Sequence, residues 1–233
     1  MGETLKGQVA IVTGASGALG TSIVISLLAA GATVAGIDRS GAKTEPVAHS
    51  IQRYTANLTD PEDAGRAIAT AAKELGKIDI LVHVMGAFAG GTSVADTDDT
   101  TWNKMMDVNL NAAFYLLRAV VPVMRAAGHG RIIAIASRQA VQPAANVGAY
   151  SASKAALVSL VQTVALENKD KNIRANVILP GTMDTAANRA AMPNAHFDKW
   201  VKTSHVADVV VMLAGEAGTE ITGAAIPIYG QDG

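Results

Sequence analysis

Cysteine is absent from this chain of 233 residues. The absence excludes disulfides, Fe–S clusters, cysteine-ligated zinc and thiol catalysis. Aromatic residues are few, at 4%, and charged residues make up only 17%. The formal net charge is −1, so neither a nucleic acid nor an anionic membrane surface is an expected partner. These absences remove classes of function but leave the activity open.

Apolar residues, in contrast, are abundant, at 49%. This composition excludes intrinsic disorder and supplies one large core. Residues 14–37 carry no charge, a length that suggests a membrane span, but glycines at both ends break the run and favour a turn, a helix and a strand. The first residues lack the apolar core of a secretion signal, and Lys6 stands where a myristoylation signal needs a hydroxyl. We therefore expect a cytoplasmic protein without a membrane segment.

Strand-like and helix-like segments alternate along the whole chain. The expected strands are 9–13, 33–38, 52–56, 78–84, 131–136, 174–179 and 225–229. The expected helices are 19–30, 59–75, 102–127 with a bend at Pro122, 149–167 and 206–214. Strict alternation predicts one α/β domain over 1–233, a doubly wound (Rossmann) fold with a seven-stranded, mostly parallel sheet. Ligands of such folds bind beyond the carboxyl ends of the strands.

A glycine-rich turn follows the first expected strand. Its candidate cofactor-binding residues are Gly14, Ser16, Gly17, Leu19 and Gly20. Glycines there permit a tight turn and the close approach of a pyrophosphate to a helix N-terminus. Asp38 ends the second strand, where a carboxylate can accept hydrogen bonds from the ribose of NAD and would repel the 2′-phosphate of NADP. Arg39 could instead pair with that phosphate, so the sequence favours NAD(H) and leaves NADP(H) open.

A second set of residues has the chemistry of proton transfer. Tyr150 and Lys154 are four residues apart, hence on one face of a helix. A nearby ammonium stabilises a phenolate, which lowers a tyrosine pKa from its reference near ~10. Ser137, just past the fifth strand, can hydrogen-bond a substrate carbonyl at the same edge. Asn109 lies in an expected helix, where Asn has low propensity, and could hold a water or a backbone group in a proton relay.

Taken together, these motifs resemble the short-chain dehydrogenase/reductase family, in its order and at its spacings, over essentially the whole chain. The resemblance adds further cofactor-binding candidates, namely Asn57, Leu58, Gly86, Pro180, Gly181, Thr182 and Thr185. It implies that Tyr150 is the acid/base and that Lys154 orients the nicotinamide ribose and lowers the tyrosine pKa. It also implies that Ser137 positions the carbonyl and that Asn109 completes a water-linked relay. Members of the family are usually homotetramers or homodimers, and 102–127 resembles their oligomer-forming helix.

The chain departs from the family pattern at three places. The usual Asn-Asn-Ala-Gly after the fourth strand is His83-Val84-Met85-Gly86 here. Gly86 still admits the cofactor, but the Asn that ties neighbouring strands is missing, and Val84 cannot replace its hydrogen bonds. Ala18 stands where the compact subgroup has glycine. The segment 185–205 is short for a substrate lid, so we expect an open site or a small lid.

A narrower resemblance, to dihydropteridine reductases, concerns two segments. Residues 86–91 resemble the loop after their fourth strand, and 179–185 with Asn188, Arg189, Met192, Pro193, Phe197 and Trp200 resembles their lid. Those enzymes use NADH to reduce a quinonoid pterin and typically lack the catalytic serine, which Ser137 supplies here. Alcohol–carbonyl chemistry is therefore the first hypothesis and pterin reduction the second. A non-catalytic dinucleotide-binding regulator is the third, although a regulator has no chemical need for the Asn–Ser–Tyr–Lys set.

The remaining candidates are assigned mainly to packing. The five histidines, His49, His83, His129, His196 and His205, lack metal-ligand spacing, so no metal is expected. His83 is interpreted as a satisfied core histidine. Residues 96–99 are interpreted as a solvated, acidic helix start. Phe88 and Trp200 could line an apolar substrate pocket, although Trp200 is first interpreted as a packing residue.

Overall fold

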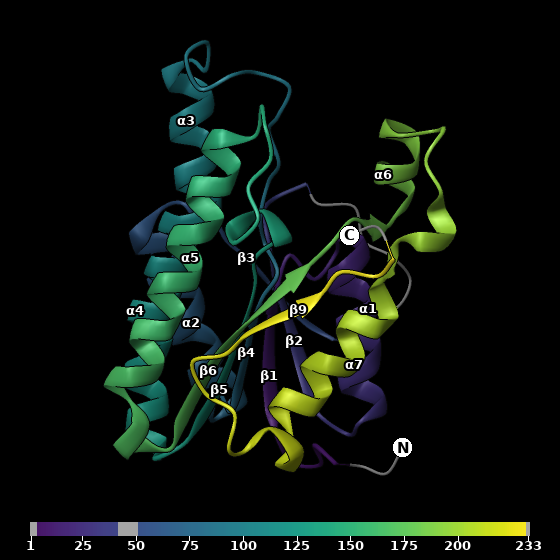
Figure 1. Ribbon diagram of the computed structural model, residues 1–233. Helices are drawn as coiled ribbons and strands as arrows, with labels where there is room; N and C mark the ends of the chain where they lie inside the picture. Colours follow the sequence, from purple (N-terminus) through teal and green to yellow (C-terminus); the bar gives the residue numbers. More distant parts are fainter. Residues whose placement is uncertain (1–3, 42–50, 232–233) are drawn as a thin grey trace.

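The computed structural model of the protein describes residues 4–41 and 51–231 (Figure 1). The expectations for His49 and for the first three residues fall outside these ranges. The main sheet has the strand order β3-β2-β1-β4-β5-β6-β9, and every neighbouring pair is parallel. The bounds of its strands are β1 (Val9–Thr13), β2 (Thr33–Asp38), β3 (Gln52–Thr55), β4 (Ile80–His83), β5 (Gly130–Ile135), β6 (Ile173–Pro180) and β9 (Ala225–Ile228). The predicted seven-stranded Rossmann sheet is confirmed.

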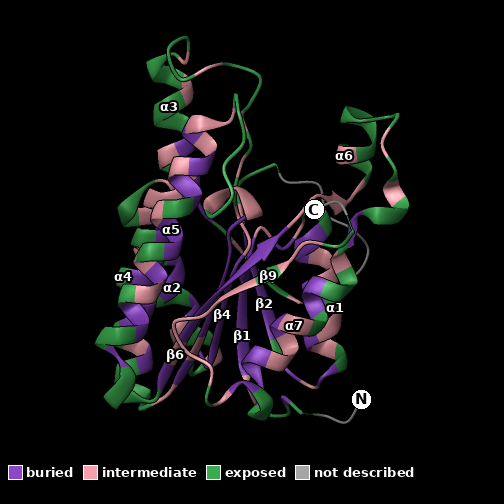
Figure 2. Ribbon diagram, viewed as in Figure 1, coloured by how far each residue is buried: buried purple, intermediate pink, exposed green. Residues whose placement is uncertain are grey.

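Two layers of helices cover this sheet. The helices are α1 (Ala18–Ala29), α2 (Pro61–Leu75), α3 (Asp99–Met106), α4 (Ala112–Ala127), α5 (Gly148–Glu167), α6 (Ala186–Ala191) and α7 (Thr203–Ala214). α2, α4 and α5 cover one face, and α1 with α7 covers the other (Figure 1). Successive side chains of a strand point to opposite faces, so Ile11 joins the core under α4 while Val12 joins the core under α1. The five inner strands, from β2 to β6 in the strand order, are therefore mostly buried on both sides, whereas the edge strands β3 and β9 are partly exposed (Figure 2).

Acidic side chains start two of the helices, as the sequence predicts. Asp60 accepts hydrogen bonds from the backbone N–H groups of Glu62 and Asp63, both at 2.9 Å, and Pro61 follows it at the first helical position. Asp98 accepts from the backbone N–H of Thr101 at 2.7 Å. Both contacts satisfy N–H groups that a helix leaves unpaired at its start.

The long helix expected over 102–127 is interrupted, but not at Pro122. A π-helical segment, η2 (Asp107–Asn111), separates α3 from α4, and Pro122 lies inside α4. A π turn inserts one extra residue and re-aims the side chains next to it. Here it directs Asn109 inward, where that side chain is fully buried. The helix is therefore interrupted at the candidate relay residue, and the bend at Pro122 stays a prediction.

The segment between β6 and α7, for which the sequence predicts a small lid, forms a short subdomain beside the main sheet. It contains α6, and a two-stranded parallel sheet of β7 (Met183–Asp184) and β8 (Val201–Lys202) closes its base. Arg189 in α6 makes two hydrogen bonds to Asp184, at 2.6 and 2.9 Å. α6 stands apart from α3 across the carboxyl edge of the main sheet (Figure 1).

Among the described residues, the stretch Asp99–Ala127 is long and apolar enough to cross a membrane by length and composition. Its apolar face packs on the core that α2 and the sheet share, as helices of water-soluble domains also do. Length and composition alone are therefore weak evidence for a membrane span here.

Candidate active site

The sequence-derived candidates gather at one edge of the sheet, beyond the carboxyl ends of the strands. The glycine-rich turn follows β1, Gly86 follows β4, Ser137 follows β5 and Gly181 follows β6. The strand order reverses between β1 and β4, which is where doubly wound folds bind dinucleotides.

The turn after β1 leaves room for a ligand by keeping its own backbone compact. A Cβ on Gly20 would clash with the carbonyl oxygen of Gly14, so α1 packs directly on the turn. Gly17 is the N-cap residue of α1 and gives no side-chain cap. The first N–H groups of α1 are thus available to an anion such as a pyrophosphate. Leu19 itself is buried and supports the turn from below.

Asp38, at the end of β2, is held by two other elements. Its Oδ1 accepts from the Ser16 hydroxyl at 2.8 Å and from the Ser16 N–H at 3.2 Å. Its Oδ2 lies 3.3 Å from Nη1 of Arg53 on β3. Arg39, the cation considered from the sequence, is exposed. Asp38 is therefore preorganised beside the glycine-rich turn, with a cation that the sequence reasoning missed.

Asn57 and Leu58 follow β3 and take different positions. The Asn57 side chain accepts from the N–H and the hydroxyl of Thr59, at 3.3 and 2.8 Å. Leu58 is buried in the core. A cofactor could thus reach Leu58 only through its backbone.

His83 restores the link between strands that the sequence suggests is lost. The Thr13 hydroxyl, on β1, lies 3.2 and 3.3 Å from the N–H groups of Val84 and Met85 and 3.0 Å from Nδ1 of His83. The arrangement that satisfies all three contacts has Thr13 accept from both N–H groups and donate to Nδ1. The expected loss of a strand tie is therefore wrong, because Thr13 and His83 join β1 to β4.

His83 is nevertheless only half satisfied. Its Nε2 is buried and has no hydrogen-bond partner within the described residues. Burial, helped by the charge of Lys154, lowers the His83 pKa to about 3, so the imidazole is neutral at physiological pH. His83 is a core residue, as the sequence indicates. Only one of its two ring nitrogens, Nδ1, has a hydrogen-bond partner among the described residues.

Asn109 anchors the loop after β4. Its Oδ1 accepts from the N–H of Ala87 at 2.8 Å, and its Nδ2 donates to the carbonyl of Ala87 and to the Ser153 hydroxyl, both at 3.0 Å. Ser153 in turn donates to the carbonyl of Tyr150 at 2.7 Å. The sequence reasoning missed Ser153, although it precedes Lys154 in the Tyr-x-x-x-Lys motif. Asn109 thus ties the loop at Gly86 to the helix that carries Tyr150.

Tyr150 and Lys154 lie on α5 and share this buried environment. Burial raises the pKa of Tyr150, and the hydrogen bond with Ser137 offsets the rise only in part. Burial lowers the Lys154 pKa to about 8. Lys154 Nζ donates to the carbonyl of Ile135 at 3.0 Å, so its ammonium is directed at the end of β5. The expected lowering of the Tyr150 pKa by Lys154 is therefore not found, because burial of the phenol dominates.

Ser137 lies between Tyr150 and a residue that the sequence did not suggest. Its hydroxyl donates to Gln139 Oε1 at 2.6 Å and accepts from the N–H of Gln139 at 3.3 Å. It also hydrogen-bonds the Tyr150 side chain. Two hydroxyl groups therefore converge at the carboxyl end of β5.

Gly86 packs closely against Asn109 and Lys154. A Cβ at Gly86 would lie 3.0 Å from both Asn109 Oδ1 and Lys154 Nζ. The Phe88 ring lies edge-on to Tyr150, with ring centroids 5.0 Å apart, and Phe88 is 67% exposed. Trp200, in contrast, is 6% exposed and packs on Phe197, as its interpretation as a packing residue requires.

The residues after β6 line the base of the lid. Pro180 ends β6, and the N–H of Gly181 donates to the carbonyl of Ile228 at 2.8 Å. The Thr182 carbonyl accepts from the N–H of Val201 at 2.9 Å, and the Thr185 hydroxyl caps α6. These contacts fix the lid next to the candidate site. Within the described ranges, no three His, Asp or Glu side chains gather as metal ligands.

Comparison with known proteins matches the chain to one family model. Residues 8–195 match the model described as "short chain dehydrogenase". A 2-(R)-hydroxypropyl-CoM dehydrogenase from Xanthobacter autotrophicus is 33% identical over 96% of this chain and 97% of the relative. Dehydrogenase/reductase SDR family member 4 from Oryctolagus cuniculus is 30% identical over 98% and 94%. A crystal structure of NAD⁺-bound xylitol dehydrogenase superposes with a TM-score of 0.89, 25% identity and coverage of 96% and 98%.

The matched segment contains the glycine-rich turn, Asn109, Ser137, Tyr150 and Lys154. Both the sequence match and the strand order extend across this candidate site. The chain therefore belongs to the short-chain dehydrogenase/reductase family of oxidoreductases.

Proposed function

We propose that the protein transfers a hydride between a nicotinamide cofactor and a carbonyl or secondary alcohol, with Tyr150 as the proton donor and acceptor. The observation that carries the proposal is the convergence of the Tyr150 and Ser137 hydroxyls at the carboxyl end of β5. Two relatives named above are dehydrogenases of hydroxyl compounds by their names, which supports this chemistry.

The cofactor supplies the hydride, and the protein supplies position and a proton. In the direction of carbonyl reduction, the Ser137 hydroxyl turns its one proton from Gln139 Oε1 to the carbonyl oxygen and donates a hydrogen bond there as negative charge develops. Tyr150, whose raised pKa keeps the phenol protonated near neutral pH, donates its proton to the same oxygen. The ammonium of Lys154, with a pKa of about 8, is charged at neutral pH and stabilises the phenolate that remains.

Asn109 acts in this proposal through the loop it holds. Its side-chain oxygen and nitrogen make three hydrogen bonds to Ala87 and Ser153. The side chain therefore positions the backbone next to Gly86. The resemblance implies a water-linked proton relay. In this proposal the relay would use backbone groups of η2 and the Lys154 side chain, because the Asn109 side chain is already engaged.

NAD(H) is the proposed cofactor, and NADP(H) remains open. The first N–H groups of α1 fit a pyrophosphate, and the Asp38 carboxylate fits a ribose diol. Relevant to this choice, the structural relative named above is bound to NAD⁺.

Reduction of a planar dihydropteridine is the second candidate function. Phe88 supports it, because an exposed ring beside Tyr150 offers a surface on which a flat heterocycle can stack. Ser137 weighs against it, since dihydropteridine reductases typically lack that serine.

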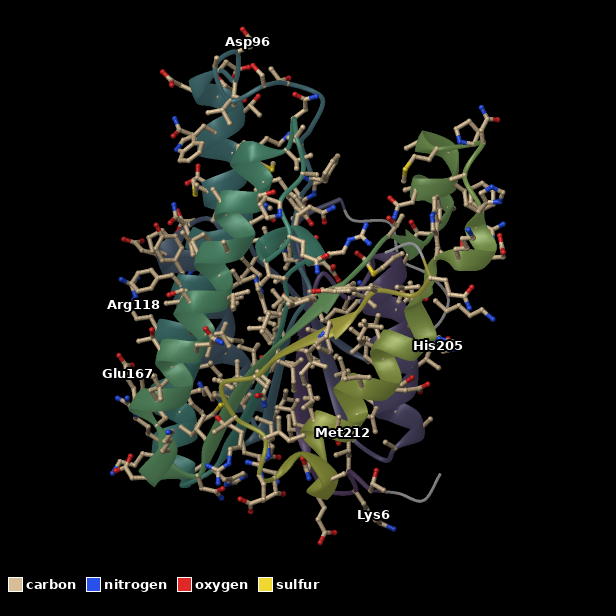
Figure 3. The ribbon with its side chains drawn as sticks, viewed as in Figure 1. Lys6, Asp96, Arg118, Glu167, His205 and Met212 are labelled. Atoms are coloured by element: carbon tan, nitrogen blue, oxygen red, sulfur yellow. The ribbon has the colours of Figure 1, made fainter. Side chains whose placement is uncertain are left out.

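We also propose that the protein acts as a homodimer or homotetramer. The outer face of α4 carries Phe114, 42% exposed, and Arg118 lies over the rings of Phe114 and Tyr115 at 5.2 and 5.4 Å. Figure 3 shows Arg118 on this outer face, pointing away from the sheet. Aromatic and arginine side chains are enriched at protein interfaces. The cytoplasmic location stays a prediction.

The proposed function is tested by binding and then by turnover. NADH and NADPH are titrated first, and the preferred cofactor is then assayed with a panel of carbonyls and with quinonoid dihydropterin. We expect a carbonyl substrate to be reduced. Tyr150→Phe should lower kcat at least about 100-fold, because general acid catalysis contributes about 10²–10⁴, while the Kd of NADH stays within about twofold. Full activity in Tyr150→Phe would contradict the proposal, and turnover of the pterin alone would favour the second candidate.

A further inference from the structure

The adenosine end of the proposed cofactor site contains a cation–carboxylate pair that the family resemblance does not include. Arg53 lies on β3 opposite Gly36, two residues before the position that pairs with Asp38. Its Nη1 lies 3.3 Å from Asp38 Oδ2. Because Gly36 has no side chain, nothing on β2 stands between Arg53 and the carboxylate. Arg53 and Asp38 therefore share the face of the sheet on which Ser16 lies.

This pair is partly shielded from water. The side chains of Arg53 and Asp38 are 26% and 10% exposed. Opposite charges in such surroundings interact more strongly and are screened less by salt than exposed pairs. The opposite carboxylate oxygen is engaged by the two donors of Ser16. Asp38 is thus presented with its charge largely balanced on one side by Arg53.

The balance of charge bears on cofactor choice. A lone carboxylate at the end of β2 repels the 2′-phosphate of NADP. A guanidinium within hydrogen-bonding distance of that carboxylate cancels much of the repulsion and offers N–H donors, in the planar geometry that suits phosphate. Arg39 is adjacent to Asp38 in sequence but exposed. The surrounding water weakens the interaction of its charge with a phosphate.

We propose, on the basis of the proposed function, that Arg53 is a cofactor-specificity residue that allows the site to accept NADP(H) beside NAD(H). The Ser16–Asp38 contacts hold the carboxylate for the ribose hydroxyls of NAD(H). Arg53 supplies the positive charge that a 2′-phosphate requires in the same place. Cofactor preference is then set by the Asp38–Arg53 pair and not by Asp38 alone.

The test is the ratio of the Kd of NADPH to the Kd of NADH, measured by titration without any substrate. Arg53→Gln should raise this ratio about tenfold, the loss of one charge-assisted contact, chiefly by weakening NADPH. Arg53→Lys, which retains the charge, should restore part of the NADPH affinity. Asp38→Asn should move the ratio the other way. Thermal unfolding of each variant establishes that it is folded.

Arg66→Gln is the matched control. Arg66 is an exposed arginine on α2 that pairs with Asp63 at 3.0 Å, so its replacement changes the net charge equally and should leave the ratio within about twofold. A ratio unchanged in Arg53→Gln would overturn the inference, as would equal weakening of both cofactors, since a purely structural role has that effect. NADH binding without turnover of any carbonyl would contradict the proposed function and leave this inference standing.

Discussion

Lys154 is a cation in a place where burial opposes its charge. It is 4% exposed, and its Nζ has the Ile135 carbonyl as its partner at 3.0 Å. Burial brings its pKa from 10.5 down to about 8. Below pH 8 the lysine is charged in both the folded and the unfolded chain, so the full cost of burying the charge is present there. The shift corresponds to roughly 3 kcal/mol.

Lys154→Met should therefore raise the stability of the fold at neutral pH but not at high pH. Between about pH 8 and 10.5 the unfolded chain binds more protons than the folded one, so the wild type gains stability from this group as the pH rises. At pH 7 the variant should be more stable by about 1–3 kcal/mol, after about 1 kcal/mol is subtracted for the lost hydrogen bond to Ile135. The gain should vanish near pH 10.5. Urea unfolding at the two pH values measures both.

Lys104→Met is the control for this experiment. Lys104 is exposed on α3, and its replacement should change the free energy of unfolding by less than about 0.5 kcal/mol at either pH. A Lys154→Met variant that is less stable than the wild type at pH 7 would show that the ammonium is better solvated than the structure indicates.

At the scale of elements, η2 is the segment that shapes the site. It turns Asn109 inward, and three hydrogen bonds join that side chain to Ala87 and Ser153. The loop carrying Gly86 is thereby tied to α5. π-helical turns inside α-helices are frequent at functional sites, and this one lies at the residue that holds the loop.

Asn109→Ala should loosen this loop. We expect the free energy of unfolding to fall by about 1–3 kcal/mol, because the backbone groups of Ala87 lose buried partners. The Kd of NADH should rise about tenfold, since the loop at Gly86 is no longer held. Calorimetric titration and urea unfolding give the two numbers.

Asn111→Ala serves for comparison, because it lies in the same π-helical segment and its side chain bonds only the exposed Asp107, at 2.8 Å. It should affect neither measurement strongly. If Asn109→Ala destabilises the fold but binds NADH as the wild type does, the loop does not depend on Asn109 in the way described.

The elements also show what sequence reasoning can and cannot reach. The alternation of strand-like and helix-like segments predicts all seven main strands and the parallel sheet, because the connecting helices cover both faces of such a sheet. The π turn at 107–111 could not be predicted from the apolar periodicity of the sequence. The inward position of Asn109 depends on Ala87 and Ser153, which are distant from it in sequence. The same holds for Arg53, whose role arises from its position opposite Gly36 on a neighbouring strand. The His83–Thr13 link likewise joins residues 70 positions apart.

At the scale of the molecule, the candidate site and a buried acid lie at opposite ends of the parallel strands. The carboxyl edge carries the candidate site, and the amino edge carries a buried acid, Asp79, that is 2% exposed. Asp79 accepts from the N–H of Val9 at 2.7 Å and lies 2.9 Å from Lys77 Nζ and 2.6 Å from His129 Nε2. Burial raises its pKa, but these partners together hold the pKa below its usual value.

Asp79→Asn should therefore lower stability without touching the site. The charges left behind, on Lys77 and His129, are 45% and 44% exposed, so the loss is that of the hydrogen bonds to the carboxylate, about 1–3 kcal/mol, and the melting temperature should fall accordingly. The Kd of NADH and kcat per folded molecule should stay within about twofold of the wild type, because the site lies at the opposite edge. Asp170→Asn, an exposed acid paired with Lys171 at 2.7 Å, should leave the melting temperature unchanged. A large loss of NADH affinity in Asp79→Asn would show that the two edges are coupled.

The most direct test of the central claim follows the hydride itself. NADH carrying deuterium at both C4 positions of the nicotinamide is incubated with the protein and a carbonyl substrate found in the panel, and the product is analysed by mass spectrometry. The account predicts one deuterium on the carbinol carbon of the product for the wild type, and product formation lowered at least about 100-fold for Tyr150→Phe. Oxidation of NADH with no deuterium in the product, or equal transfer by Tyr150→Phe, would contradict it.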